Sequence, residues 1–103
     1  MTFLQTCAGI YRARDAVFGR LPEPQFRILI DLAANGGCSV TSACIASGAP
    51  ATTGLRAVGE LERAGLVERL PVPFDRRTAK LELTDLGRER IAEIARLTGG
   101  TND

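Results

Sequence analysis

Residues 41–83 read TSACIASGAPATTGLRAVGELERAGLVERLPVPFDRRTAKLEL, and this stretch decides the fold. Its first half has the composition of two helices, because Gly48 interrupts an otherwise helical pattern. Thr41 is expected to cap a short helix that ends near Ala46, and Pro50 is expected to start a second helix that runs to about Ala64. The stretch therefore begins as a helix, a tight turn and a second helix.

The second half of the stretch has the alternation of a β-hairpin. Residues 66–70 and 78–83 alternate apolar and polar side chains, which is typical of half-buried strands. Residues 71–77 between them are rich in proline and charge and are predicted to form the turn. The sequence thus places a two-stranded hairpin directly after a helix-turn-helix.

Further helices are expected on both sides of this stretch. Residues 2–18 have a broad apolar stripe at helical spacing, and Pro24 suits the first turn of a helix that runs to about Ala34. Thr84 is predicted to cap a last helix. The apolar residues expected to face the core are Phe26, Leu29, Ile30 and Ala33, then Leu55, Val58 and Leu61, then Leu66 and Val67.

The length of 103 residues is that of one domain with one core. The predicted fold class is mainly α with a small β-hairpin, a winged helix-turn-helix. Residues 1–20 would form an N-terminal dimerisation helix, 21–83 the winged-helix core, 84–98 a C-terminal helix and 99–103 a frayed tail.

Composition excludes several function classes. The chain has no histidine, which removes the commonest general base and the commonest metal ligand, so we expect no enzyme, no metal and no cofactor. Three cysteines without a C-x-x-C pair predict reduced thiols in the cytoplasm rather than a zinc site or disulfides. No apolar stretch is long enough for a membrane span. The net charge of +1 by itself indicates no partner.

The second helix of the pair has the side chains of a DNA-reading helix. Thr52 and Thr53 lie in its first turn, where backbone amides also favour phosphate, and Arg56 follows one turn later. An arginine in this place can reach a guanine edge or a phosphate in the major groove. We therefore predict that these three residues contact double-stranded DNA.

The predicted hairpin turn contains a second candidate DNA contact. Arg76 and Arg77 bring two planar guanidinium groups to the tip, which suit phosphate or a narrow minor groove. Asp75 can hold one of these arginines in position through a bidentate ion pair. We predict that the two arginines bind DNA and that the aspartate supports them.

These elements resemble the MarR (multiple antibiotic resistance regulator) family of bacterial winged-helix transcription factors. The resemblance rests on ELER at 60–63, GLVER at 65–69, DRR at 75–77 and LTDLG at 83–87, in the family's order. It implies a homodimer on a pseudo-palindromic operator. In such a complex the recognition helices would enter successive major grooves and the wing arginines the flanking minor grooves.

The terminal helices raise two further expectations. These helices have more apolar side chains than one small core can bury. This excess predicts a homodimer with Ile10 and Ile94 in its seam. The first helix also has an apolar stripe of Phe3, Ile10, Tyr11, Val17 and Phe18. This stripe is interpreted as core or dimer seam, and the alternative is a pocket for a small aromatic effector.

A different class of function remains open on the same sequence. Ile45 is expected to be exposed, and Ala51 and Gly54 leave the second helix sparse in contact groups. Together with the near-neutral charge, these features would suit a winged helix that binds a protein instead of DNA. The alternative is thus a protein-protein interaction module without DNA binding.

Overall fold

The computed structural model describes residues 2–73 and 75–99, with the backbone alone for 75–78. The helices in this part of the chain are α1 (Phe3–Phe18), α2 (Glu23–Asn35), α3 (Val40–Ala46), α4 (Ala51–Arg63) and α5 (Asp85–Thr98). The strands are β1 (Cys38–Ser39), β2 (Val67–Val72) and β3 (Asp75–Leu83). This is the predicted fold class, mainly α with a β-hairpin after a helix-turn-helix.

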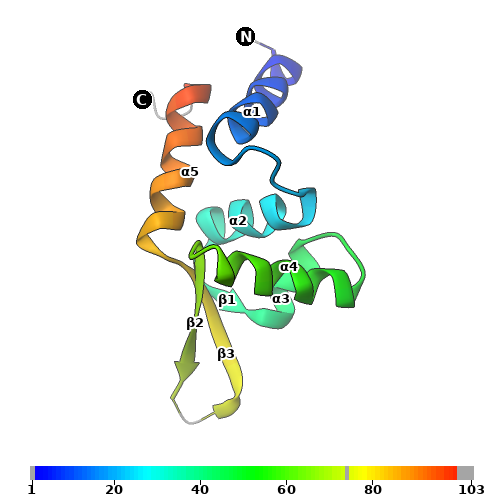
Figure 1. The fold of residues 1–103 in the computed structure, drawn as a ribbon, viewed down its shortest axis with the longest axis vertical. Helices are drawn as coiled ribbons and strands as arrows, with labels where there is room; N and C mark the ends of the chain where they lie inside the picture. The colour runs from blue at the N-terminus through cyan, green and yellow to red at the C-terminus, as the bar shows by residue number, and fades with distance from the viewer. Residues whose placement is uncertain (1, 74, 100–103) are drawn as a thin grey trace.

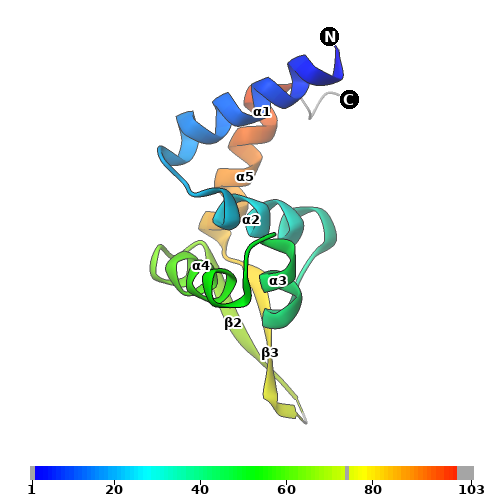
Figure 2. The same ribbon diagram turned by 90° about the vertical axis from the view of Figure 1, so that its right-hand side faces the viewer.

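The molecule is elongated, with principal extents of 47 × 28 × 22 Å. Figures 1 and 2 show α1 and α5 together at one end and the β2–β3 hairpin reaching away at the other. Helices α2, α3 and α4 lie between these two ends. The hairpin therefore extends beyond the helical body. We refer to this hairpin, β2 and β3, as the wing.

The helix ends follow from their capping residues. The Thr2 hydroxyl accepts a hydrogen bond from the Gln5 amide (3.1 Å), and the Gln5 side chain accepts one from the Thr2 amide (2.8 Å), so α1 begins with a capping box. The Thr84 hydroxyl caps α5 by accepting from the Gly87 amide (3.0 Å) and also donates to the Gly65 carbonyl oxygen (2.6 Å). Thr84 thus joins the start of α5 to the turn before the wing.

The core is built mainly by the winged-helix part. Its fully buried large side chains are Ile28, Leu29, Val58, Leu61 and Leu81. A smaller cluster of Ala13, Phe26 and Ile94 joins α1, α2 and α5. The predicted core positions Leu66 and Val67 are confirmed, being 6% and 2% exposed.

The sheet is larger than predicted. Its strand order is β1-β3-β2, all antiparallel, with Cys38 opposite Leu81 and Val67 opposite Leu83. Strand β1 was not predicted because two residues are too short to show alternation. The wing strands also run further than expected: β2 continues to Val72 and β3 begins at Asp75, both inside the range 71–77 that was predicted as a turn.

Three local predictions are wrong. Ser39, not Thr41, caps α3, through a 3.0 Å hydrogen bond from the Ser42 amide to its hydroxyl. In α2 the buried positions include Ile28 and Leu32, whereas Ile30 and Ala33 are exposed. In α4 the predicted core residue Leu55 is 51% exposed, and Gly54 and Ala57 are buried in its place.

Candidate nucleic-acid interface

Helix α4 is held by one face and leaves the opposite face open. It packs through Gly54, Ala57, Val58 and Leu61. Gly54 lies where α4 meets α3: a Cβ there would be 3.0 Å from the Ser47 Oγ atom and 3.1 Å from the Cys44 carbonyl oxygen. Gly54 is therefore a close-packing residue buried away from the outer surface, and the expectation that it thins the contact surface is wrong.

The open face carries the residues predicted for DNA contact. Thr52, Thr53 and Arg56 are all exposed. Arg63, two turns after Arg56, is exposed too and lies on the same stripe by helical periodicity. Arg63 was not among the predicted contacts, although its spacing of seven residues from Arg56 was a signal that could have found it. Between the two arginines lies Gly59, whose added Cβ would meet only the Arg63 Nη1 atom, at 3.7 Å.

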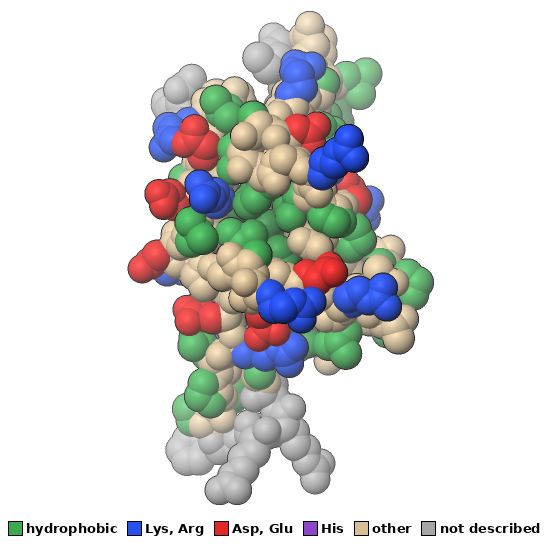
Figure 3. Space-filling view, in the orientation of Figure 1, with side chains coloured by type: hydrophobic (Ala, Val, Ile, Leu, Met, Phe, Trp, Pro, Cys, Tyr) green, Lys and Arg blue, Asp and Glu red, His purple; other side chains and the backbone are tan. Residues whose placement is uncertain are grey.

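The two carboxylates of α4 are engaged beside this face. Glu60 accepts a hydrogen bond from Gln25 of α2, with 2.7 Å between the Gln25 Nε2 and Glu60 Oε1 atoms. Glu62 pairs with Arg69 of β2 at 2.9 Å. These contacts hold both carboxylates at the flanks of α4. The Glu62 charge is paired with a cation, whereas Glu60, bonded to the neutral Gln25, keeps its charge one turn from Arg56. In Figure 3, Lys and Arg side chains alternate with Asp and Glu side chains at the level of α4.

The N-terminus of α4 adds backbone donors to the same surface. Its N-cap residue is Pro50, which makes no side-chain capping hydrogen bond. The first turn of a helix has amides without intrahelical partners, and these point along the axis where the helix dipole favours an anion. The first turn that carries Thr52 and Thr53 is thus suited to a phosphate group.

The wing is fixed at its root and extends from there. The Glu62–Arg69 ion pair joins β2 to α4, and Lys80 pairs with Glu82 at 2.9 Å on β3. The backbone of Arg76 and Arg77 belongs to β3, at the far end of the hairpin (Figure 1). The side chains of these two arginines and of Asp75 lie outside the described residues. Their DNA contacts, and the support by Asp75, remain predictions.

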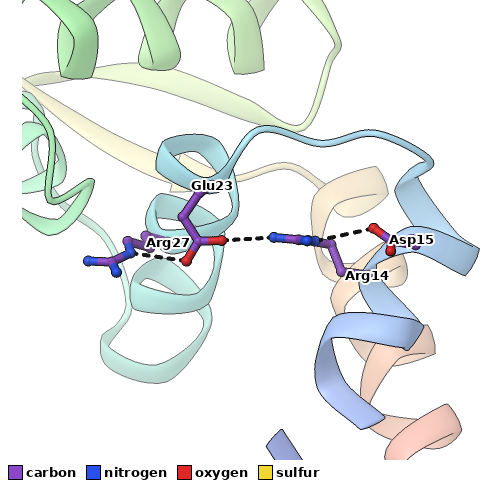
Figure 4. A network of polar contacts seen from close by, with 4 residues as sticks. All are labelled: Arg14, Asp15, Glu23 and Arg27. Atoms are coloured by element: carbon purple, nitrogen blue, oxygen red, sulfur yellow. Dashed lines mark hydrogen bonds and ion pairs between the residues drawn. The ribbon is translucent and has the colours of Figure 1, made fainter. Parts of the chain in front are cut away.

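A network of polar contacts connects α1 to the winged-helix body (Figure 4). Arg14 of α1 pairs with Glu23 of α2 at 2.8 Å, and Glu23 pairs with Arg27 at 3.2 Å. The Arg14 guanidinium also lies over the rings of Tyr11 and Phe26, 5.0 and 5.4 Å from their centroids. Two aromatic rings and a carboxylate thus hold this cation where α1 meets α2.

A pocket of about 550 Å³ opens beside this network. Its lining includes Cys7, Ile10 and Tyr11 of α1 and Phe26 and Ile30 of α2. Part of the predicted apolar stripe therefore faces a cavity. The other three members do not line it: Phe3 is 78% exposed, Val17 packs against the smaller core cluster, and Phe18 packs against both clusters.

Two other kinds of site are absent from the described residues. Residues 2–73 and 75–99 hold no group of three potential metal ligands among histidine, cysteine, aspartate and glutamate. No helix in this part of the chain has the length and apolar character needed to cross a membrane.

Known proteins share this sequence pattern and this fold. The profile of the MarR family matches residues 21–78. RV1404 from Mycobacterium tuberculosis is 26% identical with a TM-score of 0.83, and the match covers 94% of this chain and 66% of that one. The transcriptional regulator Tm0710 from Thermotoga maritima is 26% identical with a TM-score of 0.80, over 94% and 70% of the two chains.

A third similar structure is a complex with DNA. The transcriptional repressor CouR, bound to a 23-mer DNA duplex, is 30% identical with a TM-score of 0.72, and the match covers 93% of this chain and 66% of CouR. The chain thus spans about two thirds of the length of CouR and of RV1404. No curated protein sequence matches it significantly.

Proposed function

The chain belongs to the MarR family of transcriptional regulators, and from this premise we propose that it binds a specific DNA sequence as a homodimer. The operator is a pseudo-palindrome, and each protomer inserts α4 into one major groove while its wing reaches the flanking minor groove. The proposal includes no catalytic step. Its place of action is the cytoplasm, where a bacterial regulator meets DNA.

The observation that carries this proposal is the charge arrangement on α4. Arg56 and Arg63 stand on its open face, whereas Glu60 and Glu62 are engaged at its flanks by Gln25 and Arg69. A polyanion can approach such a face without meeting a carboxylate at its centre. The structure of CouR bound to a 23-mer DNA duplex supports the same use of the fold.

The homodimer in this proposal is supported by the terminal helices. Phe3 and Leu4 of α1 are 78% and 76% exposed, and Leu97 of α5 is 55% exposed. Large apolar side chains concentrated at one end of a small protein are typical of an interface with another protomer. The pocket beside α1 is proposed to admit a small aromatic effector, which would contact the half-exposed Tyr11 and the Ile10 side chain.

A protein-interaction role is the second candidate. Ile45 on α3 is 75% exposed, and an exposed isoleucine on the helix before α4 suits an apolar partner surface. Under this alternative, α4 would not read bases.

Selection of random DNA duplexes with the purified protein at low salt distinguishes the two candidates. We expect enrichment of one sequence with two similar half-sites about one helical turn apart, because a two-fold dimer presents two α4 helices. Recovery of no preferred sequence, with a single protein partner captured under the same conditions, would overturn the DNA-binding proposal.

A further inference from the structure

We propose that Leu55 determines part of the DNA sequence preference by contacting the C5-methyl group of a thymine. This inference rests on the proposed function, because it takes α4 as the helix that enters the major groove. Leu55 is 51% exposed on α4 and directly precedes Arg56. It therefore stands at the edge of the same open face that carries the two arginines.

Leu55 has no role in the protein core. The packed face of α4 is filled by Gly54, Ala57, Val58 and Leu61, and Leu55 belongs to neither core cluster of the described residues. Helical side chains lean toward the preceding turn, which here contains Ala51 and Thr52. Both are small, so they leave the leucine uncovered on that side.

The next turn also leaves the side chain uncovered. Position 59, four residues further along the helix, is a glycine, and a Cβ built there meets no side-chain atom of Leu55 within 4 Å. A leucine flanked by small residues on both sides can come close to a flat surface such as the floor of a groove. Leu55 is the one large apolar side chain among the exposed residues of α4.

The charges around Leu55 decide which partner this apolar side chain meets. Arg56 and Arg63 on the same face favour a polyanion over an apolar protein surface. The thymine methyl is the apolar group that DNA presents in the major groove, and aliphatic side chains contact it. Because Leu55 and Arg56 are adjacent, the thymine is expected in a base pair next to the one that Arg56 contacts.

The exposed Ile45 provides a matched control. It is a large aliphatic residue, 75% exposed, but it belongs to α3 and not to the helix that enters the groove. If any exposed apolar side chain could produce methyl sensitivity, the Ile45→Ala and Leu55→Ala variants would behave alike. The inference requires that they differ.

The experiment uses the duplex obtained by selection and replaces each thymine in turn with deoxyuridine, which removes only the methyl group. For the wild-type protein we expect one thymine in each half-site whose replacement weakens binding about fourfold, as expected for one methyl group leaving an apolar contact. Leu55→Ala should bind the thymine and uracil duplexes equally. Leu55→Met and Ile45→Ala should keep the discrimination.

The outcomes distinguish a failure of the proposed function from a failure of the inference about Leu55. If no duplex is enriched by selection, the proposed function fails and the inference fails with it. If a duplex is bound but the wild-type protein tolerates every uracil, the inference is overturned while the proposed function stands. Equal discrimination by Leu55→Ala and wild type would overturn it as well, since the methyl would then act through DNA shape.

Discussion

Arg56 is the first cation on the open face of α4, one turn after the helix N-terminus. If it forms a bidentate contact with a guanine, Arg56→Ala should cost about 1–3 kcal/mol on the preferred duplex and relax the choice at one base pair in each half-site. Competition titrations with single-base variants of the duplex measure both effects. Arg20→Ala, which removes an exposed arginine outside α4, is the control for charge alone. Equal losses for the two variants on every sequence would contradict base reading by Arg56.

Gly59 offers a second test at the residue scale. An added methyl there meets only the Arg63 Nη1 atom at 3.7 Å, so Gly59→Ala should stabilise the free protein by up to about 1 kcal/mol through helix propensity. The same methyl should weaken DNA binding, because it would stand between α4 and the groove. The melting temperature in thermal unfolding should therefore rise, while the affinity for DNA in an anisotropy titration should fall. Unchanged affinity would mean that α4 does not approach DNA at this position.

Gly54→Ala is the matched comparison for Gly59→Ala. Its methyl would be 3.0 Å from the Ser47 Oγ atom and 3.1 Å from the Cys44 carbonyl oxygen. We therefore expect this variant to be destabilised, by about 1–3 kcal/mol, as is usual for overpacking.

Leu55 was predicted to be buried but is exposed, and the reason is a tertiary contact that the sequence pattern does not show. Spacing by three or four residues joins Leu55, Val58 and Leu61 into an apolar ridge, and two of these three are buried. The packed face is instead completed by Gly54 and Ala57, which have little or no side chain and so give no hydrophobic signal. Their burial follows from the close approach of α3 to α4, which is a tertiary contact.

At the scale of elements, the wing carries the predicted DNA contacts of Arg76 and Arg77, and these can be tested by substitution. Replacing both Arg76 and Arg77 by alanine should weaken binding to all sequences by similar factors and reduce the dependence of affinity on salt, because these arginines are predicted to neutralise phosphates or enter a narrow minor groove. Asp75→Ala should weaken binding less than the double change if Asp75 only orients an arginine. Circular dichroism checks that each variant is folded.

The double variant also has a clear negative outcome. If it binds the selected duplex as tightly as wild type with the same salt dependence, the hairpin does not contact DNA.

Most elements could be predicted from sequence because their boundaries are marked by local chemistry. Thr84 caps α5 as expected, and Gly36 and Gly65 stand at helix ends with φ of 81° and 77°. Strand β1 escaped prediction since two residues pair with β3 only after the chain has folded. The hairpin strands ran longer than predicted because their cross-strand pairing continues through Pro71, a residue that suggests a turn.

At the scale of the whole molecule, the proposed dimer seam is expected further out than Ile94, one of the two residues that the sequence suggested for it. Ile94 is 4% exposed and packs with Ala13 and Phe26 inside one protomer, so its change to aspartate would disrupt the fold rather than a dimer contact alone. Exposed residues at the helical end test the seam better. Leu4→Asp and Leu97→Asp should each convert the dimer to a folded monomer, because a charge in an apolar seam is costly.

Analytical sedimentation at micromolar protein concentration measures the oligomeric state of each variant and so tests this prediction directly. Ile45→Asp, an equally polar change at an exposed isoleucine away from the terminal helices, should stay dimeric. A monomeric wild-type protein at that concentration would contradict the proposed assembly.

The dependence of affinity on salt tests the central claim, that this winged helix binds DNA through α4 and the wing, most directly. Fluorescence anisotropy with the selected duplex at 50 and 200 mM salt gives the number of phosphates neutralised. A dimer that contacts about 6–10 phosphates should lose about 10³- to 10⁵-fold in affinity over this range. An affinity that changes less than a few-fold would contradict DNA binding through these surfaces.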